Sequence, residues 1–522
     1  MSSDARRAAW LRTGPPLIVA ALTALAFWSC LRLGLVYDDV VFLNPEGLTA
    51  GRALTGAPFC NYAPLSQLTF VGDFEFWRGA PFGYHLTSLL FHAANAAAFY
   101  GLCLELFAAG KAAGRDRAAA AVSALLFSLH PLRVQSVAWV SERRDVVCGL
   151  FFIGALYFWL RAHRPEERRG GYWRGLSWGA FLLALLSKAS AVPLPAILVL
   201  LAVFPLGLLP ASPRRWTDPA ARAVWRETAP FFLLSAAFSP VVIFAQWKCG
   251  AIDVIHAPPG ERARQILTGL VFYIGKTIWP TRLSFYEWHW APVRSAVLLG
   301  AIATAALLAA AAVSRRLRSP LLAALAYQTL MLAPTLSVGL GHEMAADRYT
   351  YLSGLAWAAL AGAGLRSLPP RFRRGAAAAA AALALLLAVM ARAQSEVWRN
   401  STTLWRRALQ LDPMSAIARR NLAAAVMADG RLGEAILLLE EQNRLYPDDT
   451  ETRAALSGLI SSTGTTVRDH ARFHEELGRE FAAAGKFEGA AWHFKQALRY
   501  DPQSAALRAE LSGAQGAAGA AR

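Results

Sequence analysis

Charged residues are scarce in this chain. They make up 17% of its 522 residues, whereas a soluble globular protein is nearer a quarter charged. The uncharged stretches form apolar blocks of about membrane length, roughly 17–25 residues. This pattern excludes an ordinary soluble protein and predicts a polytopic membrane protein. The blocks lie at 15–36, 85–108, 117–130, 146–161, 174–209, 228–247, 294–313, 320–340, 350–365 and 375–391.

The first apolar block, 15–36, is interrupted by Arg32 alone. It is longer than the apolar part of a secretory signal, and no small-residue cleavage site is obvious after it. We therefore interpret it as a retained membrane helix.

Cysteine is also scarce, with five residues in the whole chain. None forms a Cys/His cluster with zinc spacing. Cys30, Cys103 and Cys148 lie in apolar blocks, where we expect packed thiols. Cys60 and Cys249 fall in loops that we place outside the cytoplasm, and their spacing leaves open whether they form a disulfide.

Acidic residues are fewer than basic ones, 35 against 53, which gives a formal net charge of +18. We attribute this charge to cytoplasmic loops that anchor the membrane helices, because no basic face on a soluble domain indicates nucleic-acid binding. Arg6, Arg7 and Arg12 place the N-terminus in the cytoplasm, and the acidic segment 36–84 then lies outside. The basic loops that we expect inside are 110–117, 161–174, 212–226, 314–320 and 366–374.

The stretch 264–279 is apolar enough to count as a span, but that choice would put the basic loop 314–320 outside. Because Arg264 and Lys276 flank or interrupt the stretch, we interpret it as an interfacial or re-entrant helix. Block 174–209 breaks at Lys188 into a hairpin. The prediction is eleven spans, with the C-terminus outside.

The composition changes after Ala393, and we expect two domains, 1–394 in the membrane and a soluble helical domain at 395–522. Two copies of one helix–turn–helix pattern follow, and Pro413 and Pro447 are 34 residues apart, which is the tetratricopeptide period. Such repeats stack and usually offer a groove for a peptide, although a purely stabilising cap is an alternative. The fold class is therefore all-α, with a membrane helical bundle and C-terminal helical repeats.

Ionisable residues gather beside the predicted outer ends of the helices, where they indicate function. Asp38 and Asp39 directly follow the first span. A carboxylate there could take a proton from an acceptor hydroxyl, and the neighbouring charge could raise its pKa. Cations on the same side could hold the phosphate of a lipid-linked donor as it leaves. The candidate phosphate-binding residues are His130, Arg143, Arg144, Lys188 and Arg348.

We expect Arg144, Lys188 and Arg348 to converge, and Lys188 has no acidic neighbour in the sequence. Supporting polar roles are expected for His85, Glu142, Asp145, Asp347 and Tyr349. The same side also carries Lys276, Tyr286, Glu287, His289, His342 and Glu343.

Several stretches match one family in the expected order. They are "YDDVVFLN" (37–44), "GYHLTSLLFHAANA" (83–96), "LFSLHPLRVQSVAWVSERRDVVCGLFF" (126–152), "LSKASAVPLP" (186–195), "GKTIWPTRLSFY" (275–286) and "MAADRYTYLSG" (344–354). With the repeats, the chain resembles the transmembrane and tetratricopeptide repeat-containing O-mannosyltransferases, in the GT-C glycosyltransferase class, and their bacterial relatives.

The resemblance implies an acidic pair in the first external loop, here Asp38 and Asp39. It further implies a polyprenyl-phosphate sugar donor, inversion at the anomeric carbon and a protein acceptor. The expected location is a bacterial inner membrane, with the repeats in the periplasm. Ala63 departs from the family, whose members usually carry His or Arg before the Pro-Leu of this loop. The sugar, the acceptor and the part played by a divalent cation are left open.

Three functions follow from these observations. The leading hypothesis is a glycosyltransferase that uses a lipid-phosphate-linked sugar. The alternatives are a non-catalytic membrane scaffold that displays the repeats, and a polymerase or ligase of lipid-linked glycans. A scaffold would tolerate loss of the Asp pair, and a ligase would need a diphosphate-linked glycan.

Overall fold

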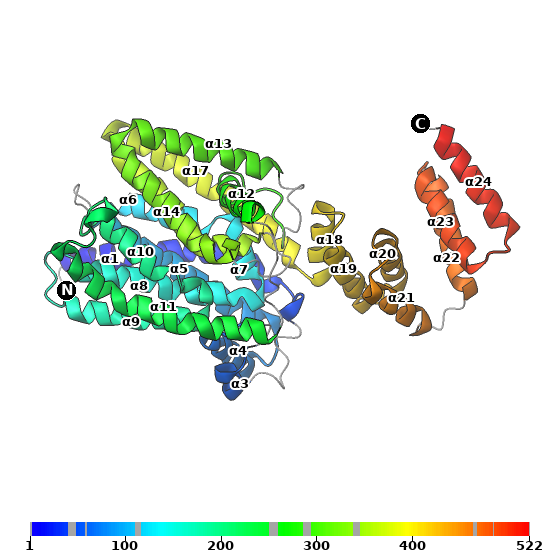
Figure 1. Ribbon diagram of the computed structural model, residues 1–522, viewed down its shortest axis with the longest axis horizontal. Coiled ribbons are helices and arrows are strands. Elements are labelled where there is room, and N and C mark those ends of the chain that lie inside the picture. Colours follow the sequence, from blue (N-terminus) through cyan, green and yellow to red (C-terminus); the bar gives the residue numbers. More distant parts are fainter. Residues whose placement is uncertain are drawn as a thin grey trace. The chain divides into compact units, whose positions relative to one another are not determined.

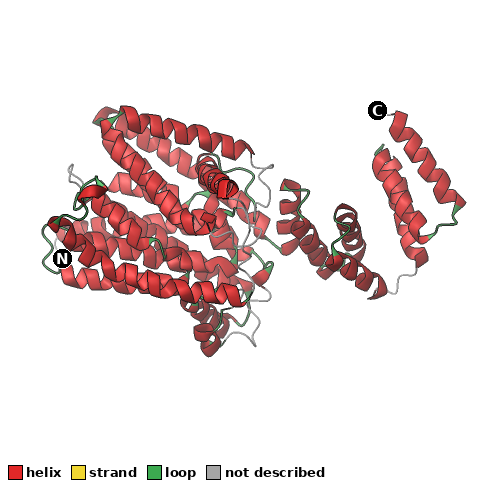
Figure 2. Ribbon diagram, in the orientation of Figure 1, coloured by secondary structure: helices red, strands yellow, loops and turns green. Residues whose placement is uncertain are grey.

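The computed structural model describes residues 3–39, 49–57, 60–109, 116–249, 259–285, 294–337, 345–462, 467–483 and 485–520. Figure 2 shows helices and loops only in these ranges, which confirms the all-α prediction. The chain forms two compact units, Met1–Ser415 and Ala416–Arg522. Residues 395–415, which the change of composition places with the repeats, lie in the first unit.

Each predicted apolar block contains a helix in the first unit (Figure 1), although the first block becomes extended after Arg32. Within the described residues, six helices are long and apolar enough to cross a membrane, so the chain is an integral membrane protein. The helices in these blocks are α1 (Ser3–Ala26), α5 (Pro81–Ala109), α6 (Arg117–Ser128), α8 (Arg143–Ala162), α9 (Gly170–Ser187), α10 (Leu194–Val203), α11 (Arg222–Lys248), α13 (Arg294–Val313), α14 (Arg315–Ser337), α16 (Leu355–Ser367) and α17 (Pro370–Ser395). The six are α5, α8 with its preceding turn, α11, α13, α14 and α17.

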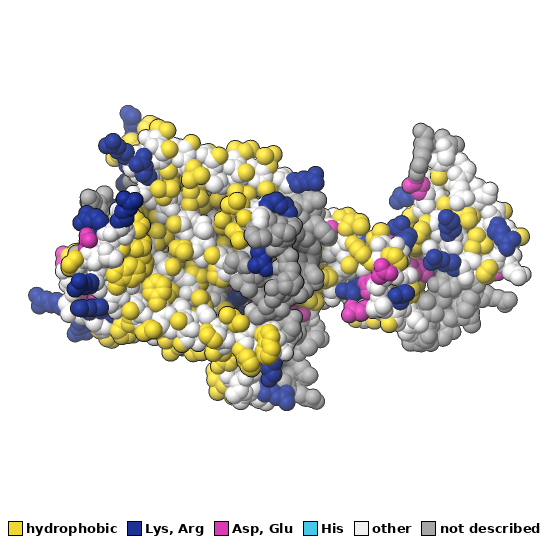
Figure 3. All heavy atoms as spheres, viewed as in Figure 1, with side chains coloured by type: hydrophobic (Ala, Val, Ile, Leu, Met, Phe, Trp, Pro, Cys, Tyr) yellow, Lys and Arg dark blue, Asp and Glu magenta, His cyan; other side chains and the backbone are white. Residues whose placement is uncertain are grey.

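The helix surfaces are apolar where a soluble protein would be polar. On α13, Leu298 and Ile302 are 63% and 60% exposed, and on α17, Leu385 and Val389 are 67% and 60% exposed. Figure 3 shows apolar side chains over the length of the helices. Such a surface is stable only against lipid, because in water it would be a large exposed hydrophobic patch.

The predicted cytoplasmic loops lie together at one end of the first unit. Arg164 pairs with Glu105 at the end of α5, and Glu227 of α11 pairs with His163 at 2.7 Å and with Arg174 at 2.9 Å. On other helices, Arg373 approaches Asp116 at 3.6 Å and Arg316 donates to the Ser367 carbonyl at 3.1 Å. Figure 3 shows Lys and Arg gathered at the end where α1 begins.

Short helices and turns occupy the opposite end of the first unit. The Asp pair follows η1 (Trp28–Arg32), and two further helices belong to the first loop, α3 (Ala50–Thr55) and α4 (Pro64–Trp77). The remaining short elements are η3 (Pro131–Arg133), α7 (Val134–Ala138), η4 (Val140–Glu142), η5 (Ala189–Ala191), η9 (Asp347–Tyr349), α15 (Thr350–Ser353), η10 (Glu396–Trp398) and α18 (Ser401–Leu411).

The stretch expected to lie in the interface forms α12 (Pro259–Ile278). It is not among the six apolar spans of the described residues. Figure 1 shows α12 nearly end-on, across the direction of α13 and α14. It packs tightly on α13, where a Cβ on Gly275 would lie 1.9 Å from the Ala296 carbonyl oxygen. Only glycine fits this helix crossing.

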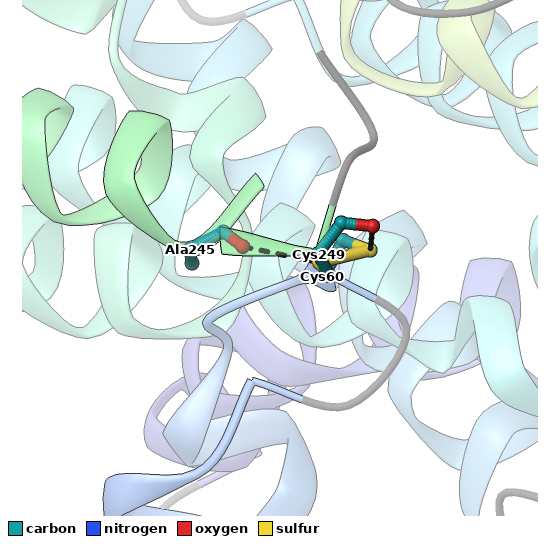
Figure 4. Close-up of a disulfide and its surroundings, with 3 residues drawn as sticks. All are labelled: Cys60, Ala245 and Cys249. Atoms are coloured by element: carbon teal, nitrogen blue, oxygen red, sulfur yellow. Dashed lines mark hydrogen bonds between the residues drawn. A yellow bond between two sulfur atoms is a disulfide. The ribbon is translucent and has the colours of Figure 1, made fainter. Parts of the chain in front are cut away.

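Cys60 and Cys249 form a disulfide, with their Cα atoms 5.8 Å apart (Figure 4). It joins the loop between α1 and α5 to the end of α11, opposite the basic loops. Cys30, Cys103 and Cys148 are buried free thiols, as predicted.

The second unit contains the two sequence copies as helix pairs. The first copy is α19 (Ala416–Ala428) with α20 (Leu432–Leu445), and the second is α22 (Val467–Ala483) with α23 (Phe487–Tyr500). Gly430 and Gly485 occupy the same position in the two copies and have φ of 78° and 71°, which glycine adopts without steric cost. The helices α21 (Thr450–Ser462) and α24 (Ala505–Ala520) complete the unit.

Candidate active site

The chain turns sharply where it leaves the first membrane helix. After η1 the backbone is extended, and Tyr37 has a φ of 50°, a left-handed conformation that is uncommon for a non-glycine residue. Asp38 and Asp39 follow at once. We call residues 34–39 the Asp38 turn.

Asp39 is a structural member of this turn. Its carboxylate accepts hydrogen bonds from the Ser141 amide at 2.7 Å, the Ser141 hydroxyl at 2.6 Å and the Val36 amide at 3.1 Å. The side chain is 0% exposed. Burial raises the pKa of Asp39 to about 6, although these hydrogen bonds oppose the shift. Asp39 therefore ties the turn to the segment before α8.

Asp38 is only half-buried, and no described residue donates a hydrogen bond to its carboxylate. Burial raises its pKa, the charge of Asp39 adds to the effect, and Arg144 and Arg348 oppose it. The resulting pKa is about 7. The two residues therefore differ in role. The Asp39 carboxylate is held by hydrogen bonds within the protein, whereas the Asp38 carboxylate can accept a proton near neutral pH.

Three cations meet around one carboxylate beside Asp38. Glu142 accepts from Arg144 at 2.7 Å and from Lys188 at 2.7 Å, and it lies 3.6 Å from Arg348. The cations come from the start of α8, the end of α9 and η9, so only the tertiary fold brings them together. We call Glu142, Arg144, Lys188 and Arg348 the cation cluster.

Lys188 has acidic partners that its sequence neighbours do not reveal. Besides Glu142, its ammonium group contacts Asp145 at 2.9 Å, and Asp145 also accepts from the Ser136 hydroxyl at 3.0 Å. Buried charges require such partners. Lys188 is therefore a structural ion-pair partner as well as a candidate anion ligand.

The cation cluster keeps hydrogen-bond donors for a further anion. Arg144 uses one Nη atom on Glu142, and its buried Nε–H has no hydrogen-bond partner among the described residues. With Asp145, the cluster sums to three positive and two negative charges. The cluster therefore keeps one net positive charge that can attract a phosphate.

Two of the residues predicted to bind phosphate instead make structural contacts away from the cation cluster. Arg143 pairs with Asp73 at 2.5 Å and donates to the Tyr84 carbonyl at 2.7 Å, which ties α8 to α4 and α5. His130 caps η3 by accepting from the Leu132 amide at 3.3 Å, and its other ring nitrogen lies 3.0 Å from the Thr277 carbonyl oxygen.

The supporting residues have mixed positions. The His85 ring lies 3.4 Å from the Gly34 carbonyl oxygen and so supports the Asp38 turn. Arg348 donates to the Tyr349 hydroxyl at 3.4 Å, and Asp347 is buried beside it. Glu142 and Asp145 belong to the ion-pair network described above. Tyr286, Glu287, His289, His342 and Glu343 lie outside the described residues.

Sequence reasoning missed two positioning residues. Ser141 holds Asp39, and Gln135 accepts from the Arg348 amide at 2.8 Å while donating to the Phe285 carbonyl at 3.0 Å. No local pattern distinguishes either residue, because its importance comes from contacts with distant segments. Within the described part of the chain, no group of three or more His, Cys, Asp or Glu side chains is arranged to hold a metal ion.

Comparisons with known proteins point to one group of relatives. The chain is 28% identical to human protein O-mannosyl-transferase TMTC3 over 205 residues, which cover 36% of this chain and 21% of the relative. It is 22% identical to Drosophila melanogaster Tmtc3 over 88% of this chain and 57% of the relative. The chain resembles the TMTC protein O-mannosyltransferases.

The TMTC resemblance confirms the likeness expected from the sequence, and no family model matches. The chain spans from about a fifth to little more than half of the length of these TMTC relatives. Among solved structures, ArnT from Cupriavidus metallidurans bound to undecaprenyl phosphate aligns with a TM-score of 0.41 and 16% identity, over 90% of this chain and 81% of ArnT.

Proposed function

We propose that this protein is a membrane glycosyltransferase that transfers a sugar from a polyprenyl-phosphate donor to a hydroxyl group. The observation that carries the proposal is the half-buried Asp38 carboxylate, next to the cation cluster, at the end of the membrane unit. A lipid-linked phosphate at a membrane surface would lie at the depth where the helices end.

In the proposed reaction, Asp38 is the general base. Its carboxylate takes the proton of the acceptor hydroxyl as the oxygen attacks the anomeric carbon. The bond from this carbon to the phosphate oxygen breaks, and the electron pair leaves with the phosphate. Attack on the face opposite the phosphate inverts the anomeric carbon.

The cation cluster stabilises the departing phosphate. Arg144, Lys188 and Arg348 supply positive charge that is fixed before the donor arrives, so no reorganisation is needed as negative charge develops. Glu142 holds the three side chains in place and prevents their mutual repulsion. Arg143 and His130 have no part in this step, because their polar atoms are already bonded to other parts of the protein.

The proposed location is the outer face of a bacterial inner membrane. The basic loops share one end of the bundle, and the positive-inside rule assigns that end to the cytoplasm. The disulfide between Cys60 and Cys249 lies at the opposite end, and disulfides persist in oxidising compartments such as the periplasm. Both observations support a cytoplasmic N-terminus and an external Asp38.

The names of the relatives support a hexose such as mannose as the sugar and a protein as the acceptor. We assign acceptor recruitment to the helix pairs of the second unit, as in tetratricopeptide repeats. Their role is binding and not chemistry.

The test uses the full-length protein in nanodiscs with undecaprenyl-phosphate mannose and a peptide rich in Ser and Thr. We expect mannosyl-peptide from the parent and none above background from Asp38→Asn, with donor binding retained. Transfer at the parent rate by Asp38→Asn would refute the proposed base. Transfer from a diphosphate-linked glycan alone would favour a ligase, and binding without any transfer would favour a scaffold.

A further inference from the structure

The segment that follows the last membrane helix contacts the Asp38 turn directly. The Tyr37 amide donates to the Ser401 hydroxyl at 3.1 Å, and the Gly34 amide donates to the Arg399 carbonyl at 3.0 Å. These residues are more than 360 positions apart in the chain. A Cβ on Gly34 would lie 3.2 Å from the Arg399 carbonyl oxygen. The two backbones are therefore closely packed.

Aromatic rings reinforce this contact. The Tyr37 ring meets Trp405 edge-on at 5.0 Å and Phe285 edge-on at 5.3 Å. Trp139 stacks on Trp398 at 6.0 Å, and Phe285 lies 5.2 Å from Trp405. We call these five residues the aromatic cluster. Both Trp398 and Trp405 are 2% exposed, so the cluster is a packed core and not a surface patch.

The same cluster touches the cation cluster. The Arg348 guanidinium lies over the Trp139 ring, 5.6 Å from its centre. The positive charge of Arg348 also lowers the pKa of Asp38. Tyr37, which directly precedes the candidate base, and Arg348, a candidate phosphate ligand, thus both contact the aromatic cluster.

The backbone of Tyr37 explains why a support is needed. Its left-handed φ of 50° is unfavourable for a non-glycine residue and persists only where surrounding contacts hold it. The Ser401 hydroxyl satisfies the amide of this residue, and Trp405 packs on its ring. Asp38 is the next residue, so the conformation of Tyr37 sets the direction of the Asp38 side chain.

We propose that residues 395–405 are a positioning element of the active site, which holds Asp38 toward the cation cluster through Ser401, Trp405 and Tyr37. This inference rests on the proposed function. It gives the start of α18 a task in transfer chemistry that is separate from acceptor recruitment by the second unit. None of these residues touches the reacting atoms.

The test measures mannosyl transfer to a short peptide by full-chain variants in nanodiscs, together with donor binding. Ser401→Ala should lower kcat about three- to tenfold, which is the factor for one hydrogen bond of ordinary net strength. Ser401→Thr keeps the hydroxyl and should restore kcat. The dissociation constant for undecaprenyl-phosphate mannose should change less than twofold, because the cation cluster is intact.

Trp405→Ala should lower kcat more than Ser401→Ala, and Trp405→Phe should recover part of the loss. As Asp38 moves away from Arg144 and Arg348, the acidic limb of the kcat/KM profile should shift to higher pH. The matched controls are Ser177→Ala, which removes the 2.7 Å bond to the Ala155 carbonyl, and Trp173→Ala at the opposite end of the unit. Both should retain the parent kcat and pH profile.

The outcomes separate the two proposals. A parent protein that transfers no sugar refutes the proposed function, and the positioning role falls with it. An active parent whose Ser401→Ala variant keeps the parent kcat and pH profile refutes the positioning role alone. If Trp405→Ala fails to fold, Ser401→Ala and Ser401→Thr still decide the matter, since neither removes core volume.

Discussion

Replacement of Lys188 should affect both stability and donor binding, and the structure shows how to separate the two. Its ammonium group bridges Glu142 at 2.7 Å and Asp145 at 2.9 Å. In Lys188→Met, Asp145 loses its ion-pair partner while its carboxylate stays buried. Removal of one partner of a buried pair costs about 3–5 kcal/mol. We therefore expect Lys188→Met to lower the thermal unfolding midpoint, although Lys188 has no acidic neighbour in the sequence.

A second change should restore the fold without restoring the site. Asp145→Asn in the Lys188→Met background removes the stranded charge and can still accept from the Ser136 hydroxyl. We expect the double variant to unfold near the parent temperature. If Lys188 holds the donor phosphate, loss of this contact costs about 2–5 kcal/mol, or about 30- to several-thousand-fold in donor affinity.

The measurements are thermal unfolding and binding of undecaprenyl-phosphate mannose in nanodiscs for the parent, both single variants and the double variant. The reasoning on stability is refuted if Lys188→Met unfolds at the parent temperature. Donor binding at the parent level by the stable double variant removes Lys188 from the phosphate site and leaves it a purely structural role.

The other predictions concern the Asp pair, pH, the disulfide and the second unit. Asp39→Asn should cost about 1–3 kcal/mol in unfolding free energy, because an amide cannot accept all the hydrogen bonds of the carboxylate. Asp38→Asn should retain stability but lose about 10²–10⁴-fold in transfer rate. Unfolding and kinetics of both variants would show the reverse if the roles of the two residues were exchanged. Because Asp38 acts deprotonated and its pKa is about 7, kcat/KM should rise with pH below that value and level off above it, and a profile already flat from pH 5 would contradict this assignment. Cys60→Ser should cost about 2–4 kcal/mol, the usual effect of a disulfide that closes a long loop, and a reductant should lower the unfolding midpoint of the parent but not of the variant. Removal of 416–522 should impair transfer to a protein acceptor and spare a short peptide, and equal loss on both would refute a recruiting role.

The sequence alone determined the class of the protein and the ends of the bundle at which its loops lie. Apolar blocks of membrane length are local signals, and each block expected to span contains a helix in the structure. The basic loops could be assigned to one side because the charge of each loop and the order of the spans are both properties of the linear sequence. The Asp pair was recognised in the same way, from its place directly after the first span.

Only the tertiary structure separated the members of the candidate site. The sequence gives no reason to distinguish Asp38 from Asp39. In the structure, Ser141, about 100 residues away, donates two hydrogen bonds to the Asp39 carboxylate, and the Asp38 carboxylate stays available. Arg143 and Arg144 are adjacent on α8, yet helical geometry points them about 100° apart, so that Arg143 meets Asp73 and Arg144 meets Glu142.

The domain boundary shows the same limit. Composition changes after Ala393, but such a change marks the end of the membrane-spanning part of the chain and not the end of a folded unit. Residues 395–415 pack into the first unit because Trp398 and Trp405 find their aromatic partners on Tyr37, Trp139 and Phe285. Such long-range packing depends on which surfaces the folded helices bring together, and no local pattern in the sequence encodes it.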